Sequence, residues 1–149
     1  MSKGERENYR EVLRPPIWLV AFIYFLLLSL VIAIWAAFTN AIAAVSFIAS
    51  LVIQALIIHR MTSTIEVTDG ELHIGKAHIP LKYLGAATLI PKSNFVVERT
   101  RGADPAAYFA TAFWISEGVK VEVIDDRDPT PYWLISTRRG QELVAALKS

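Results

Sequence analysis

A stretch of 42 residues from Ile17 to Ile58 contains no Asp, Glu, Lys, Arg or His, and it constrains this chain more than any other feature. One continuous helix of that length would be about 63 Å long at 1.5 Å per residue. The hydrocarbon core of a bilayer is only about 30 Å thick, so the stretch predicts two membrane-spanning helices. Because polar Thr39-Asn40 lies near its centre, we expect helices over Ile17–Phe38 and Ala41–Ile58, joined by that turn.

The ends and faces of this stretch agree with a helical hairpin. Pro15-Pro16 precedes it, and proline is well tolerated where a helix begins. Small or polar side chains recur at intervals of four residues in both predicted helices. Such residues allow helices to approach closely in a membrane, so we expect the two to pack along them. They are Ser29, Ala33 and Ala37 in the first helix, and Ser46, Ser50 and Gln54 in the second.

Flanking cations predict the orientation of the hairpin. Four Lys or Arg residues precede the first helix, Arg60 follows the second, and the turn has none. The positive-inside rule then places residues 1–16 and the C-terminal region in the cytoplasm and the 39–40 turn outside. We therefore expect a multi-pass protein of the cell membrane with both termini cytoplasmic.

Two alternatives to a spanning hairpin fit the sequence less well. A cleaved signal peptide has an apolar core of about 7–15 residues, which is shorter than Ile17–Phe38, although Ala41-Ile42-Ala43 resembles a cleavage site. A buried pair of helices in a soluble protein would show a polar face, and neither predicted helix does.

The pattern changes at residue 62. Residues 64–68 and 71–74 alternate polar and apolar side chains around Asp69-Gly70, which is a strong signal for a β-hairpin. Pro80 indicates an edge strand or a turn. Further strands are expected over residues 86–90, 95–99, 108–115, 119–124 and 132–136, and a helix from about Gly140. Residues 62–149 therefore predict a small antiparallel β barrel or sandwich capped by a C-terminal helix, and the whole chain an α+β membrane protein.

The order of these elements resembles that of bacterial pleckstrin-homology-like (PH-like) domains. A more specific resemblance covers nearly the whole chain and rests on Val67–Leu72, Ala103–Tyr108 and the long motif Asp128–Arg139. These segments, with Tyr9-Arg10-Glu11, Pro15-Pro16 and the two hydrophobic spans, resemble a family of small actinobacterial membrane proteins of unknown function. The resemblance implies the two-helix architecture and a PH-like domain, and it implies no activity.

Two groups of charged residues are candidate functional residues. Arg138 and Arg139 are expected where the last strand meets the last helix, and helix N-termini favour anions. They could pair with Asp125, Asp126 and Asp128 of the preceding loop, or hold a phosphate or lipid headgroup. The three aspartates lack the regular spacing of a calcium-binding loop, so we expect a solvated turn.

Composition narrows the remaining chemistry. Residues 59–149 carry eleven Lys or Arg and eleven Asp or Glu, so this region lacks the positive charge that attracts nucleic acid. The chain has no cysteine, which excludes disulfides and thiolate metal sites. His59, His73 and His78 are more simply interpreted as surface histidines than as zinc ligands. Since no catalytic or nucleotide-binding motif is found, we expect no cofactor, no bound metal and no enzyme activity.

The sequence therefore favours a membrane-anchored interaction module, an adaptor or accessory subunit whose partners are the lipid bilayer and another membrane protein. One alternative is a domain that binds anionic headgroups at the inner leaflet through Arg138, Arg139 and Arg60. Another is an enzyme acting close to the membrane, which a pocket gathering Asp125, Asp128, His73 or Tyr132 would support.

Overall fold

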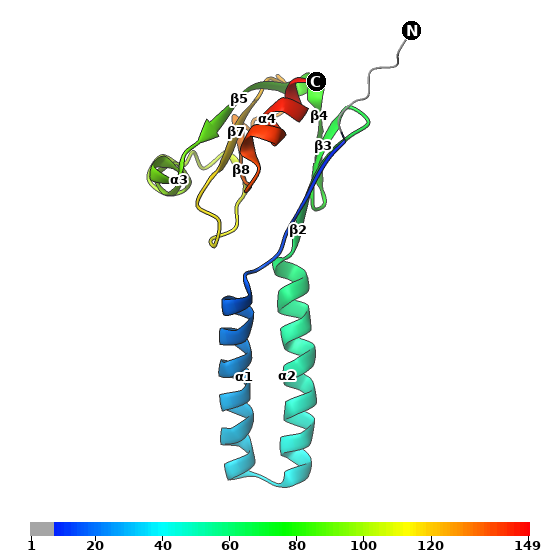
Figure 1. The fold of residues 1–149 in the computed structure, drawn as a ribbon, viewed down its shortest axis with the longest axis vertical. Helices are drawn as coiled ribbons and strands as arrows, with labels where there is room; N and C mark the ends of the chain where they lie inside the picture. The colour runs from blue at the N-terminus through cyan, green and yellow to red at the C-terminus, as the bar shows by residue number, and fades with distance from the viewer. Residues whose placement is uncertain (1–7) are drawn as a thin grey trace. The chain divides into compact units, whose positions relative to one another are not determined.

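The computed structural model describes residues 8–149, which form two compact units (Figure 1). The helical unit is Arg14–Thr62. The β unit combines the described residues up to Leu13 with Ser63–Ser149. The helical unit is therefore an insertion between the first and second strands of the β unit.

The helical unit contains α1 (Ile17–Ala37) and α2 (Asn40–Met61). Both are long and apolar enough to cross a membrane, and few of their side chains are buried within the structure. Thr39 caps α2, because its side chain accepts a hydrogen bond from the backbone N–H of Ile42. The two helices expected from the uncharged stretch are confirmed.

The first sheet of the β unit has the order β1-β2-β3-β4 and is antiparallel throughout. Its strands are β1 (Tyr9–Leu13), β2 (Ser63–Thr68), β3 (Glu71–Ile74) and β4 (Ala77–Pro80). The expected hairpin is confirmed: Asp69 and Gly70 connect β2 to β3 with φ angles of 51° and 79°. A two-residue turn of this kind requires positive φ at both positions.

The second sheet has the order β5-β7-β8-β6, with β6 parallel to β8 and the other pairs antiparallel. A short 3₁₀ helix, η1 (Leu81–Tyr83), leads into it. Its strands are β5 (Leu84–Ile90), β6 (Tyr108–Ala110), β7 (Gly118–Val123) and β8 (Tyr132–Ser136), and its helices are α3 (Lys92–Arg99) and α4 (Gly140–Lys148). Both sheets have free edges, so the β unit is not a closed barrel.

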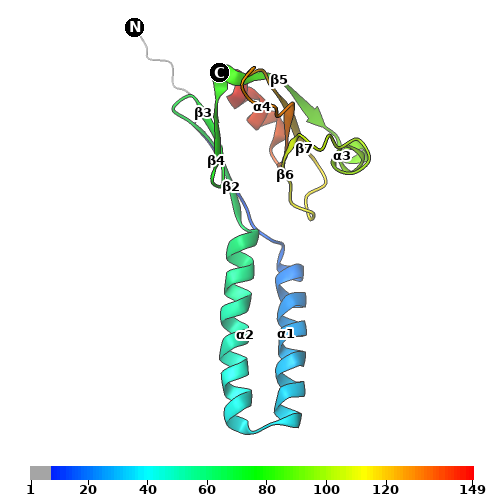
Figure 2. The same ribbon diagram turned by 180° about the vertical axis from the view of Figure 1, so that it is seen from behind.

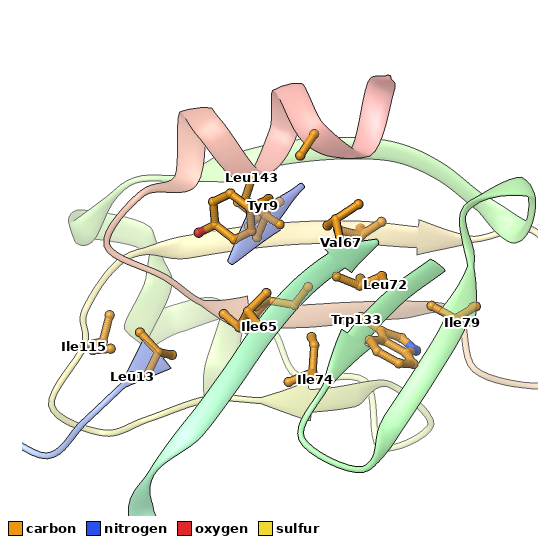
Figure 3. Packing of buried hydrophobic residues seen from close by; sticks show 14 residues of the cluster. Tyr9, Leu13, Ile65, Val67, Leu72, Ile74, Ile79, Ile115, Trp133 and Leu143 are labelled. Atoms are coloured by element: carbon orange, nitrogen blue, oxygen red, sulfur yellow. The ribbon is translucent and has the colours of Figure 1, made fainter. Parts of the chain in front are cut away.

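Buried side chains of both sheets and of α4 form one hydrophobic core, part of which is shown in Figure 3. Alternate residues of β2 and β3, such as Ile65 and Leu72, meet Val119 and Trp133 of the second sheet. Leu143 of α4 is fully buried in the same core, as the apolar stripe of the predicted helix requires. A smaller cluster on the other face of the second sheet is made by Phe95, Tyr132 and Leu134.

Two expected strands are wrong in whole or in part. Residues 95–99 lie in α3, where Phe95 is fully buried and its neighbours Val96 and Val97 are exposed. The β propensity of two adjacent valines is overridden because the helix places Phe95 against the sheet. Residues 108–115 form only the three-residue strand β6, and the chain then leaves the sheet as a loop that buries Ile115.

The β unit also includes residues that the sequence assigns to a separate N-terminal segment. Tyr9–Leu13 form strand β1, which pairs with β2 from Tyr9↔Val67 to Leu13↔Ser63. Its alternation of buried and exposed residues matches one face of a sheet. The β unit therefore does not consist of residues 62–149 alone. It is assembled from residues on both sides of the helical insertion.

Candidate functional site at the start of the C-terminal helix

The best-defined polar cluster in the described residues lies where β8 ends and α4 begins. Its centre is Glu11 of β1, a carboxylate that is only 9% exposed. One of its oxygens accepts hydrogen bonds from the Tyr9 hydroxyl at 2.7 Å and from the Thr137 hydroxyl. The other accepts from the backbone N–H of Arg138 at 3.1 Å. Glu11 therefore links the N-terminal strand to the segment that starts the C-terminal helix.

The position of Glu11 follows from strand geometry and from the helix that it faces. Side chains alternate along β1, so Tyr9, Glu11 and Leu13 all point into the β unit. A buried carboxylate requires hydrogen-bond donors, and Glu11 has three. The N-terminus of a helix also favours negative charge, and Glu11 accepts from Arg138, two residues before α4 begins.

The pKa of the Tyr9 phenol is raised from 10 to about 12, chiefly by burial. The hydrogen bond with Thr137 and, more weakly, that with Arg139 oppose this shift, whereas the hydrogen bond and negative charge of Glu11 add to it. Tyr9 therefore stays protonated as a donor to Glu11 throughout the physiological range.

Arg138 and Arg139 have different environments. The Arg139 guanidinium donates to the backbone carbonyl of Arg10 at 2.8 Å, lies 4.9 Å from the centre of the Tyr9 ring and pairs with Glu142 at 3.4 Å. Arg139 thus helps to hold the cluster together. The Arg138 side chain is exposed and makes no hydrogen bond or ion pair within residues 8–149. Of the two arginines, Arg138 is therefore the one whose guanidinium is available to a ligand within residues 8–149.

A pocket of about 470 Å³ lies beside this junction. Its lining includes apolar residues at the end of β5, the start of α4 with both arginines, and the acidic residues Glu117 and Glu142. The complete lining is Leu89, Ile90, Pro91, Glu117, Gly118, Thr137, Arg138, Arg139, Gly140, Gln141 and Glu142.

Within the described residues, the structure does not bring Arg138 or Arg139 together with the aspartate loop. Asp125 pairs with Arg127 at 3.2 Å, and this contact lowers the pKa of Asp125. Asp128 accepts a hydrogen bond from the backbone of Thr130. Asp126 is exposed. The loop comes before β8 and the arginines come after it, so five extended residues, about 17 Å, separate the two groups.

The three histidines do not gather at one place. His73 of β3 and His78 of β4 are paired across their strands, and both lie within 4 Å of the Glu71 carboxylate. His59 is exposed in the last turn of α2. In the part of the chain that the structure describes, no group of three or more His, Asp or Glu side chains is arranged to hold a metal ion.

The residues predicted to line the packing faces of the two helices differ in burial between α1 and α2. On α2, Ser50 is buried and Ser46 and Gln54 are partly buried, and the Gln54 amide donates to the Val20 carbonyl of α1 at 3.1 Å. On α1, the small residues Ser29, Ala33 and Ala37 are exposed, so that stripe faces away from α2. The α1 face turned inwards holds larger side chains, including buried Val31. Arg60 is exposed in the last turn of α2.

Tyr9 and Glu11 carry part of the family resemblance, but the sequence did not predict a strand or a polar cluster at these residues. The signal that could have found them is the alternation of apolar Tyr9 and Leu13 with charged Arg10 just before the first helix. Glu11 interrupts this pattern in the sequence, because a charged residue is normally predicted to face solvent and Glu11 faces inwards.

These features define an α+β protein in which two apolar helices are inserted between the first two strands of a two-sheet β unit. The chain belongs to the family described as "Protein of unknown function (DUF3093)", whose match covers residues 8–147. The expected membership of a family of unknown function is thereby confirmed. No curated protein and no solved structure matches the chain.

Proposed function

We propose that this protein is a membrane-anchored interaction module, an adaptor or accessory subunit of a larger membrane assembly. In this proposal α1 and α2 cross the cell membrane, and the β unit lies in the cytoplasm with both termini. The observation that supports it best is the way the helical insertion is joined to the β unit. Leu13 and Ser63 are paired in the sheet, and α1 and α2 lie only three residues and one residue away from them in sequence.

Short connections on both sides restrict the β unit to the membrane surface. Arg14–Pro16 and Thr62 are the only residues between paired strands and helices. Extended chain spans at most about 3.6 Å per residue, so Leu13 and Ser63 stay within about 14 Å of the helix ends. Tethering of this kind raises the effective concentration of any partner in the same membrane and makes weak contacts sufficient.

The outer face of α3 is the surface that we assign to a protein partner. Phe95 fixes this helix to the sheet, which leaves Val96 and Val97 47% and 52% exposed side by side. Contiguous exposed apolar surface can mark a protein contact, and these two side chains adjoin each other on an anchored helix. The resemblance of the β unit to PH-like domains stays a prediction, supported by their shared order of strands and a final helix.

Affinity purification of the full chain from native membranes in mild detergent tests this function. We expect a membrane protein to be recovered in stoichiometric amount, and to be lost from the double variant Val96→Asp, Val97→Asp. Ile124→Asp is the matched control, because Ile124 is a similarly exposed apolar residue (57%) elsewhere on the β unit. A chain that purifies alone even after crosslinking in the membrane would contradict the proposal.

A second candidate function is binding of an anionic lipid headgroup, and the pocket beside Arg138 specifically favours it. The free guanidinium of Arg138 and the start of α4 could bind a phosphate, while Leu89, Ile90 and Pro91 offer an apolar wall to the rest of a lipid. This pocket contains none of Asp125, Asp128, His73 and Tyr132, so it gives no support to a membrane-proximal enzyme.

Lipid retention distinguishes this candidate from the first. The full chain in detergent should retain phosphatidylglycerol, and Arg138→Ala should lower the retained amount several-fold. Arg127→Ala removes another exposed cation, one that is paired with Asp125 outside the pocket, and is the control. Equal retention by both variants would exclude headgroup binding at this pocket. Arg139→Ala is a poorer test, since Arg139 also supports Tyr9 and Arg10.

A further inference from the structure

The loop between β6 and β7, residues 111–117, has an unusual composition for an exposed connection. It contains Phe113 and Trp114 in succession, with their rings edge to face at 5.0 Å. Phe113 is 61% exposed, whereas Ile115 is buried in the core and anchors the loop. An exposed aromatic side chain on an anchored loop is a feature of contact surfaces.

Hydrogen bonds place this loop at a defined end of the β unit. The backbone N–H of Ala112 donates to the Ser136 hydroxyl, and the carbonyl of Glu117 accepts from Thr137. Thr137 in turn contacts Glu11, two residues before Leu13. Opposite views show the loop at the end of the β unit where β1 stops and β2 starts (Figures 1 and 2), and Figure 3 shows Ile115 and Leu13 at the same end of the core.

That end is also the one from which the chain continues into the two apolar helices. The helices, of 21 and 22 residues, are about 32 Å long, which matches the hydrocarbon core of a bilayer. The headgroup layer beyond the core is about 5–8 Å thick on each side. Since Leu13 and Ser63 lie within about 14 Å of the helix ends, the neighbouring loop is within reach of the headgroups.

We infer that Phe113 inserts into the headgroup region of the membrane and that Trp114 supports it, so that the β unit is docked on anionic lipid by this loop. The inference rests on the proposed membrane anchoring. Aromatic side chains prefer the membrane interface. The cation nearest the loop is Arg99, which donates to the Ala112 carbonyl, and Arg138 lies just beyond β8 at the same end. Both suit an anionic surface, and Glu117 is the one carboxylate of the loop.

Site-specific fluorescence tests this contact. The chain has no cysteine, so one introduced cysteine is the only thiol that a fluorescent label can modify. The full chain is reconstituted in vesicles of phosphatidylcholine and phosphatidylglycerol that contain lipids with a nitroxide quencher. Phe113→Cys carries an environment-sensitive dye. Ile124→Cys is the matched control, similarly exposed but at the opposite end of β7, and Leu30→Cys reports insertion of α1.

We expect the label at Phe113 to be quenched at least about twofold more strongly than the label at Ile124. Quenching at Leu30 with equal, weak quenching at Phe113 and Ile124 would overturn the docking and leave the membrane anchor intact. An unquenched label at Leu30 would overturn the anchor and the docking together. If Phe113→Cys changes the circular dichroism spectrum, Glu117→Cys in the same loop provides the same comparison.

Discussion

At the scale of single residues, Glu11 brings together donors from two ends of the chain. Its carboxylate accepts from Tyr9 in β1 and from Thr137 and Arg138 beyond β8. The contacts with Thr137 and Arg138 lie between residues 126 and 127 positions apart, and they join β1 to the start of α4. The cluster is therefore a structural link, and within residues 8–149 it leaves the Arg138 side chain of the pocket unpaired.

We expect Glu11→Gln to lower the free energy of unfolding by about 2–3 kcal/mol, because a neutral amide cannot satisfy three buried donors. The control is Glu66→Gln, a more exposed carboxylate on the outer face of β2, which should change stability by no more than about 0.5 kcal/mol. Thermal unfolding of the full chain in detergent measures both. Equal effects would show that the cluster does not stabilise the fold.

The raised pKa of Tyr9 predicts that the folded chain loses stability at alkaline pH. Its pKa in the folded chain, about 12, is above its ordinary value of 10, so the folded state binds the phenolic proton more strongly than the unfolded state. The corresponding stabilisation is complete below pH 10 and is lost as pH rises towards 12, at most about 3 kcal/mol. Tyr9→Phe should reduce the fall in melting temperature between pH 9 and about 11. If Tyr9→Phe showed the same fall in melting temperature as the unaltered chain, the loss of stability would come from groups other than Tyr9.

At the scale of elements, β7 and β8 are held so close that one residue has to be glycine. A Cβ atom at Gly118 would lie 2.0 Å from the Ile135 carbonyl oxygen and 2.6 Å from the Phe95 ring. The same contact fixes α3 to the sheet, because Phe95 fills the space that a side chain at residue 118 would need. This packing explains why residues 95–99 form a helix in spite of their valines.

Gly118→Ala should therefore destabilise the chain strongly, by about 3 kcal/mol or more. Gly102→Ala is the control, since a Cβ there would meet its nearest atom at 3.4 Å and needs only a small adjustment. Soluble yield and cooperative unfolding in detergent compare the two variants. A folded, stable Gly118→Ala variant would contradict the close approach of the two strands.

At the scale of the whole molecule, the helical unit is an insertion between two paired strands, β1 and β2, of the first sheet of the β unit. Leu13 and Ser63 are opposite each other in an antiparallel pair, where a two-residue turn can join strands. We expect a chain in which residues 14–62 are replaced by Asn-Gly to fold as a soluble β unit. Residues 62–149 alone should not fold, because they lack β1. Circular dichroism and dispersed amide signals in NMR spectra would decide between these outcomes.

The orientation of the proposed anchor is also testable on the whole molecule. Asn40→Cys should react with a membrane-impermeant thiol reagent added to intact cells, whereas Ser149→Cys should react only after the membrane is opened. The physical reason is the absence of Lys and Arg from the turn and their presence next to both outer helix ends. The reverse pattern of labelling would place the β unit outside the cell.

The sequence by itself determined the features that depend on local pattern: the two apolar helices, the Asp69-Gly70 hairpin, strand Tyr132–Ser136 and the C-terminal helix. Each is encoded within a few neighbouring residues by periodicity or turn chemistry. Only the tertiary structure decided that Tyr9–Leu13 pairs with β2, because that pairing spans the whole helical insertion. It likewise made residues 95–99 a helix, and it separated Arg138 and Arg139 from the aspartate loop. Such outcomes depend on which distant surfaces meet, which local sequence patterns do not specify.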